Sequence, residues 1–175
     1  QQGAAATAAE GKVQGETEAP KGDGEKESVL YYGAYIGDFG LNDMGWRAAN
    51  AAADKYGYDL KLVEYGADSS QAVNSLVDAL DTNHYDYVLA MGWYIADTIV
   101  EKSKSGEWAD TTFILFDTSP LMDLSGTDNI YGISFAQNEG SFLVAIYSAL
   151  MTKTGKIGAC INLDSPITND FGTGW

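Results

Sequence analysis

The sequence has 175 residues, a formal net charge of −15 at pH 7, 45% hydrophobic residues and one cysteine. The apolar share is that of an ordinary globular domain. The acidic balance argues against binding nucleic acid or an anionic membrane through a basic patch. The lone Cys160 excludes an internal disulfide framework and a multi-cysteine zinc site.

Residues 1–27 hold almost no large apolar side chains and consist mainly of Ala, Gly, Thr, Glu and Lys. Such a composition cannot bury enough surface to offset the entropy lost on ordering. We therefore predict a flexible tether over residues 1–27. A tether is typical of a protein held outside the cytoplasmic membrane or in the periplasm, and we expect a lipid anchor upstream of residue 1 to hold it there.

From Ser28 onward, apolar strand-like runs alternate with segments of helical periodicity. The predicted strands are 28–37, 58–66, 85–92, 111–118, 130–135 and 156–163, and the predicted helices are 42–57, 69–83, 93–106 and 138–155. A further helix begins before Trp175. Strands that alternate with helices at this spacing predict right-handed crossovers and a parallel sheet covered on both faces. The fold class is therefore α/β, with a doubly wound parallel sheet.

Catalytic motifs are mostly absent from this sequence. It has no Walker A motif, no glycine-rich GxGxxG turn after the first strand and no G-x-S-x-G nucleophile elbow. The only histidine, His84, lies in a helix-to-strand loop, where a structural role is the simpler interpretation. We therefore expect a binding protein without enzymatic activity, metal or cofactor.

Ligands of open α/β sheets bind at the carboxyl ends of the strands, and several polar residues lie there. Asp38 follows the first strand, Asn42 lies close behind it, and Asp117 follows the fourth strand. Each carboxylate could accept hydrogen bonds from a ligand, or could cap a helix or turn. For Asp68, before the second helix, capping is the favoured interpretation.

Aromatic residues collect at the same strand ends. Trp46 lies in the first turns of a helix, Trp93 follows the third strand after Gly92, and Phe135 ends the fifth. Flat aromatic faces suit a planar base or the apolar face of a sugar. For Trp46, a core position and a stacking platform are equally compatible with the sequence. The combination with acceptor carboxylates indicates a binding cleft.

The stretch "GDFGLNDMGW" resembles the opening motif of the basic membrane protein family, G-D-x-S-F-N-D-x-x-aromatic. Downstream, "YDYVLAMGW", "TTFILFD" and "NIYGISFAQNEGSFLVAIYSALMTKTGKIGACINL" follow the order and spacing of that family. The resemblance covers about residues 29–175. Members are substrate-binding lipoproteins of ABC importers, and the best understood group binds purine nucleosides.

The resemblance implies a type I periplasmic-binding-protein fold, with two lobes that close on a ligand. Residues 28–128 would form the first lobe, and residues 129–175 the crossover and the start of an incomplete second lobe. It also implies the partners: a nucleoside-like small molecule and the permease subunits of a transporter. Leu41 and Gly40 depart from the usual Phe and Ser of the motif.

The resemblance also implies roles for the residues at the strand ends. Asp38 and Asn42 would hydrogen-bond the ligand or order its loop. Trp46 would stack on the base and Asp117 would hydrogen-bond its edge. Phe135 and the backbone around Gly92 would line the hinge side.

Other functions remain open on the sequence alone. The same cleft chemistry serves sugars and other small polar ligands, and the fold also serves ligand-sensing receptor modules. An α/β enzyme that cleaves nucleosides is a further alternative, which the missing nucleophile motif disfavours.

Overall fold

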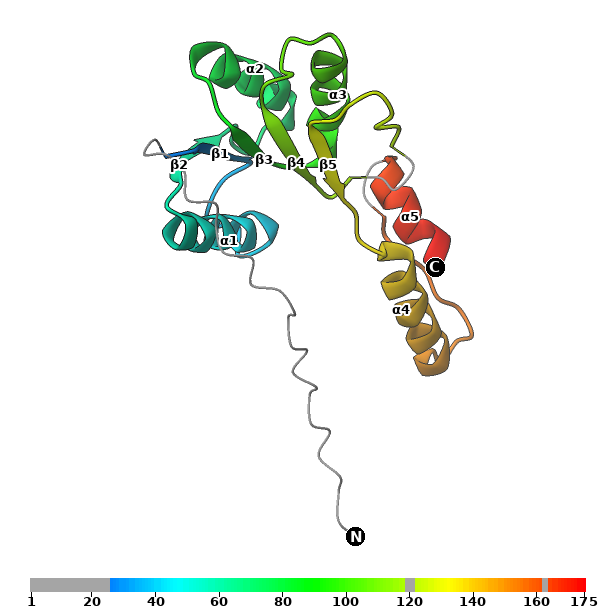
Figure 1. The fold of residues 1–175 in the computed structure, drawn as a ribbon. Coiled ribbons are helices and arrows are strands. Elements are labelled where there is room, and N and C mark those ends of the chain that lie inside the picture. The colour runs from blue at the N-terminus through cyan, green and yellow to red at the C-terminus, as the bar shows by residue number, and fades with distance from the viewer. Residues whose placement is uncertain (1–25, 119–121, 162–163) are drawn as a thin grey trace, which may run out of the picture.

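The computed structural model describes residues 26–118, 122–161 and 164–175. Most of the predicted tether therefore lies outside the described residues. The described part contains one parallel five-stranded sheet in the order β2-β1-β3-β4-β5 (Figure 1). Its strands are β1 (Ser28–Gly33), β2 (Asp59–Glu64), β3 (Tyr87–Met91), β4 (Thr112–Phe116) and β5 (Ile130–Ile133). The predicted parallel α/β sheet is confirmed.

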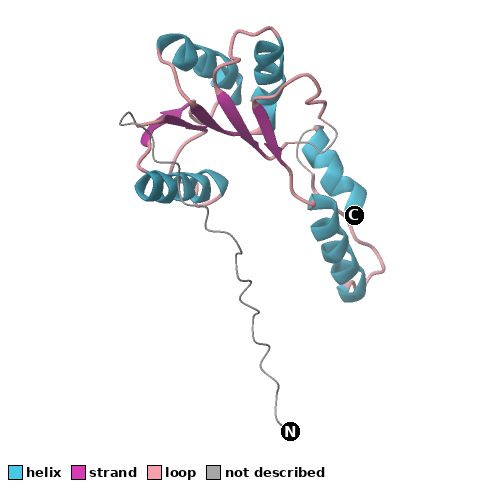
Figure 2. Ribbon diagram, in the orientation of Figure 1, coloured by secondary structure: helices cyan, strands magenta, loops and turns pink. Residues whose placement is uncertain are grey.

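Helices cover both faces of the sheet, as the strand–helix alternation predicts. α1 (Leu41–Tyr56) lies on one face, and α2 (Ala72–Thr82) and α3 (Ala96–Lys104) lie on the other (Figure 2). The short 3-10 turns η1 (Ser69–Gln71) and η2 (Trp93–Ile95) lead into α2 and α3. The sheet is therefore doubly wound.

Two adjacent tyrosines of β1 show how the core is divided, because successive side chains of a strand point to opposite faces. Tyr32 enters the large cluster between the sheet and the α2–α3 layer, and its hydroxyl donates to the carbonyl oxygen of Ala72. Tyr31 enters the smaller cluster under α1, with Ala49 and Met91. Both tyrosines are fully buried.

The register brings the carboxyl ends of neighbouring strands to one edge of the sheet. The last paired residues are Gly33 with Glu64, Met91 with Phe116, and Phe116 with Ile133. The segments that follow β1, β3, β4 and β5 therefore leave from the same edge, which is where the sequence places its candidate site.

The last two helices lie beyond β5, away from the sheet (Figure 1). α4 (Gln137–Met151) and α5 (Pro166–Gly174) pack against each other.

The predicted strand over residues 156–163 is wrong for 156–161, which form no regular structure, and 162–163 lie outside the described residues. A strand needs a neighbour for its backbone groups, and no described strand lies beside this segment. No helix in the described ranges is long and apolar enough to cross a bilayer.

Helix α4 exposes a continuous apolar surface. Its exposed large apolar side chains are Phe142, Leu143, Val144, Ile146, Tyr147, Leu150 and Met151. No charged residue lies between Gly140 and Thr152 to interrupt this surface.

We therefore expect the 175-residue chain to self-associate. Sedimentation velocity checks this, and replacing Leu143 and Leu150 by Ser should shift the chain toward monomer. A monodisperse wild-type monomer contradicts the expectation.

Candidate functional site

The loop between β1 and α1 is ordered by the carboxylate of Asp38. This carboxylate accepts hydrogen bonds from the backbone N–H of Gly40 (2.8 Å), Asn42 (3.2 Å) and Asp43 (3.2 Å). The side-chain amide of Asn42 also donates to it (2.8 Å). The Asn42 amide and then the Gly40 N–H are the main causes that lower the pKa of Asp38 to about 2. Asp38 therefore acts on its own loop, one of the two roles predicted for it.

Asn42 ties the end of β1 to the first turn of α1. Its Oδ1 accepts the backbone N–H of Ala34 (3.0 Å), and its carbonyl oxygen accepts the hydroxyl of Tyr31 (2.9 Å). The strand ends at Gly33 rather than at residue 37 as predicted, and the next backbone N–H, that of Ala34, donates to this side chain. Asn42 thus holds the start of the loop against α1.

Two residues at this junction, one in the loop and one in the first turn of α1, were not among the predicted site residues. Asp43 accepts the backbone N–H groups of Gly37 (2.6 Å) and Phe39 (2.9 Å). Phe39 has a left-handed φ of 53° and a side chain that is 98% exposed. An acidic residue in a first helical turn is a common sequence signal for such a role. Nothing local marks the conformation of Phe39, since glycine or asparagine is the usual residue there.

Trp46 has one side in the core and one side on the surface. Its ring packs against Tyr31 with centroids 5.6 Å apart and planes tilted by 58°. It also lines a hollow of about 310 Å³ together with Ile36, Phe39, Asp43 and Arg47. The two interpretations that the sequence left open are therefore compatible, because the half-buried ring serves the core and borders a surface hollow.

The end of β3 carries Gly92 and Trp93. Gly92 has a φ of 115°, and a Cβ there would lie 2.7 Å from the ring of Tyr94, so a larger residue does not fit. Trp93 is half-buried and packs edge to face on Tyr94, with ring centroids 5.6 Å apart. At this strand end two aromatic rings therefore pack together, and the backbone conformation requires a glycine at position 92.

The ends of β4 and β5 carry Asp117 and Phe135. Asp117 is half-buried and has a left-handed φ of 61°. Burial raises the pKa of its carboxyl, while a hydrogen bond from the Gln137 amide (2.8 Å) acts in the opposite direction. Phe135 is 49% exposed. Asp117 is thus a partly dehydrated acceptor, and Gln137 is a partner that the sequence did not single out.

The structure groups the predicted residues after four strands, along one edge of the sheet. Asp38, Asn42 and Trp46 form one hydrogen-bonded and packed unit at the start of α1. Gly92 and Trp93 follow β3, which lies next to β1, and Asp117 follows β4. The segment after β5 carries Phe135. The arrangement offers acceptor oxygens and aromatic faces at successive strand ends.

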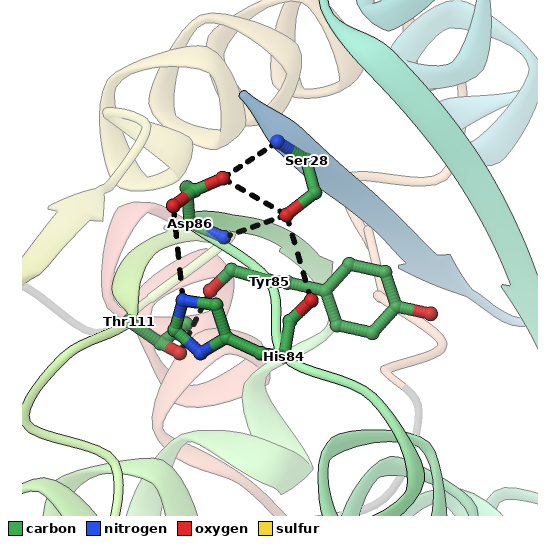
Figure 3. Close-up of polar contacts among 5 residues, drawn as sticks. All are labelled: Ser28, His84, Tyr85, Asp86 and Thr111. Carbon is green, nitrogen blue, oxygen red and sulfur yellow. Dashed lines mark hydrogen bonds and ion pairs between the residues drawn. The ribbon is translucent and has the colours of Figure 1, made fainter. Parts of the chain in front are cut away.

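A serine, a histidine and an aspartate meet at the opposite edge (Figure 3). Asp86 accepts both the N–H (2.6 Å) and the hydroxyl (2.9 Å) of Ser28, and His84 Nε2 lies 3.7 Å from its other oxygen. The hydroxyl of Thr111 donates to the carbonyl of Tyr85 (2.8 Å). The carboxylate of Asp86 lies between the serine and the imidazole. The contacts join residues at the starts of β1, β3 and β4 and hold these strand starts together. This agrees with a structural role for His84.

The family model for PnrA-like ABC transporter substrate-binding proteins, Bmp, matches residues 26–175. The chain belongs to this family. Two relatives, both described as CD4+ T-cell-stimulating antigens, come from Listeria monocytogenes and Listeria innocua. Each is 27% identical over 136 residues, which are 78% of this chain and 35% of the relative. The chain thus spans about a third of the length of the curated relatives it matches.

Solved structures show the same fold. A solute-binding protein of an ABC transporter system from Aeropyrum pernix K1 superposes with a TM-score of 0.57 at 24% identity, over 70% of this chain and 32% of that protein. A fragment from Peptoclostridium difficile 630, described as a lipoprotein, superposes with a TM-score of 0.51 at 28% identity. It covers 73% of this chain and 100% of the fragment. The periplasmic-binding-protein-like α/β fold of this Bmp chain is therefore confirmed.

Proposed function

We propose that this protein is the extracytoplasmic solute-binding component of an ABC importer and that it binds a purine nucleoside or a similar small ligand. The observation that carries the proposal is the hollow beside Trp46 at the carboxyl edge of the sheet, lined also by Phe39 and Asp43. An aromatic face can stack on a base, and half-buried Asp117 can accept a hydrogen bond from a base N–H or a sugar hydroxyl. Membership in the substrate-binding family supports this assignment.

The proposal extends to the domain organisation and the partners. Residues 28–128 would form one lobe, and residues 129–175 the crossover and the start of a second lobe that closes over the ligand. The permease subunits of the importer would receive the loaded protein. Likeness to a fragment described as a lipoprotein supports a lipid anchor upstream of residue 1, which would hold the protein at the outer face of the cytoplasmic membrane.

A binding role without catalysis fits the geometry better than an enzyme does. The carboxylate of Asp38 is engaged by its own loop, and Asp86 separates Ser28 from the ring of His84. A sugar-binding protein or a ligand-sensing receptor would use the same edge. Mass spectrometry of a ligand retained on purification would separate these ligand classes, and release of free base from a nucleoside would reveal an enzyme.

Replacing Trp46 tests the proposal directly. Stacking between a base and an aromatic ring contributes about 1–3 kcal/mol, so we expect Trp46→Ala to weaken nucleoside binding about 5- to 150-fold. Trp46→Phe should retain most of the affinity, because a flat ring remains. Calorimetric titration of the full-length protein with adenosine, inosine and guanosine measures both.

The matched control lies on the same helix. Tyr56, in the last turn of α1, is 39% exposed and does not line the hollow, so the Tyr56→Ala variant should bind nucleosides as the wild type does. Thermal melts show whether each variant stays folded. Absence of binding to all three nucleosides by folded wild-type protein rejects this ligand class.

A further inference from the structure

Gln137 is buried in a segment that is otherwise open to solvent. It is the first residue of α4 and is 8% exposed, and it is the only buried residue from Tyr131 to Val144. Glutamine is mostly an exposed residue, and burying its amide removes the hydrogen bonds it makes with water. A buried amide at this place therefore needs a partner.

That partner is the carboxylate of Asp117. Gln137 Nε2 donates to Asp117 Oδ1 at 2.8 Å across a separation of 20 residues. Because an ionised carboxylate only accepts hydrogen bonds, the amide nitrogen faces Asp117 and the amide oxygen points away. In the described part of the chain, this Oε1 is buried and has no hydrogen-bond partner. An unpaired buried acceptor costs stability. The buried position of Gln137 is therefore explained by its bond to Asp117, because it leaves the other polar atom of the amide without a partner.

The backbone around Asp117 is fixed independently of Gln137. Asp117 has a φ of 61°, a conformation that costs energy for a residue other than glycine. The next residue, Thr118, is buried, and its N–H and hydroxyl both donate to the carbonyl oxygen of Ile133 (3.1 and 3.3 Å). These bonds hold the end of β4 against β5. They do not involve the side chain of Asp117, so the direction of its carboxylate depends on the hydrogen bond from Gln137.

We propose that Gln137 is a positioning residue of the candidate site: its amide occupies one carboxylate oxygen of Asp117 and orients the other as the acceptor for a ligand N–H or O–H. The ligand part of this inference rests on the proposed function, whereas the orientation of Asp117 does not. The fixed acceptor would select ligands that present a hydrogen-bond donor at this strand end over ligands that present a carbonyl oxygen there.

The pKa of Asp117 reports on this bond, because burial raises it and the Gln137 amide lowers it. Gln137→Leu keeps the volume and removes the amide, so the pKa of Asp117 should rise above its wild-type value. Carboxyl-carbon NMR titration of the 175-residue chain measures this. Gln137→Asn, whose amide is one methylene too short, should raise it as well and serves if the leucine variant fails to fold.

The matched control is Glu139→Gln, an exposed change of one charge on the same helix, which should leave the titration of Asp117 unchanged. An unchanged pKa of Asp117 in folded Gln137→Leu and Gln137→Asn overturns the positioning role. Binding separates this result from the proposed function. If adenosine, inosine or guanosine binds the full-length protein, Gln137→Leu should weaken that binding about tenfold. If none binds but the pKa rises, the nucleoside proposal fails and the positioning of Asp117 stands.

Discussion

Gly45→Ala is expected to lower the free energy of unfolding by about 1–3 kcal/mol, the usual effect of overpacking a core. In an exposed helix interior the same change stabilises by up to about 1 kcal/mol, because alanine has the higher helix propensity. Gly45 differs because it lies in α1 directly against Tyr31. An added Cβ would clash with the phenol oxygen of Tyr31 and lie 3.1 and 3.2 Å from its ring carbons. Tyr31 is fully buried and cannot move aside easily.

Gly140 in α4 provides the matched control. A Cβ added there meets no atom within 4 Å, so Gly140→Ala should stabilise by up to about 1 kcal/mol. Urea denaturation followed by circular dichroism measures both variants. If Gly45→Ala stabilises the chain as Gly140→Ala does, α1 does not pack on Tyr31 as described, and the placement of Trp46 beside Tyr31 is wrong as well.

The sheet could be predicted from the sequence because its signals are local. The runs "YVLAM" and "FILF" are apolar throughout, as strands covered on both faces are, and helical periodicity separates them. Parallel pairing then places Asp38, Gly92 and Asp117 at one edge without any knowledge of contacts. The general location of the candidate site followed from this topology.

The details of the site depend on contacts between distant residues, which local patterns do not encode. Gln137 lies 20 residues from Asp117, and its place at the start of an apolar helix gives no sign that it is buried. Ile36 donates its N–H to Glu64, 28 residues away, at 2.6 Å. The predicted strand at 156–161 failed for a related reason, because local apolar character cannot supply a neighbouring strand. Sequence patterns located the edge of the sheet, and tertiary contacts determine which side chains remain free there.

Asn42→Ala is expected to have the second large effect, a loss of about 1–3 kcal/mol in the free energy of unfolding. The substitution leaves the N–H of Ala34 without its acceptor and removes the amide that Asp38 accepts. Asn74, an exposed residue of α2, gives the matched control, and Asn74→Ala should leave the stability nearly unchanged. Chemical denaturation near pH 7 compares the two variants. Equal stabilities would show that Asn42 does not hold the loop.

The acid side of the stability curve tests the same contact in a second way. The pKa of Asp38 is lowered from 3.8 to about 2, with the Asn42 amide as the largest cause. Its stabilising contribution is therefore present above pH 3.8 and is lost as the pH falls through about 2. In Asn42→Ala the folded-state pKa should rise toward 3.8, so less stability is lost with acid and over a narrower range. Carboxyl NMR titration of Asp38 measures the shift, and Asn74→Ala should keep the low value. A pKa that stays near 2 in Asn42→Ala would mean that the backbone N–H groups of the loop alone hold this carboxylate.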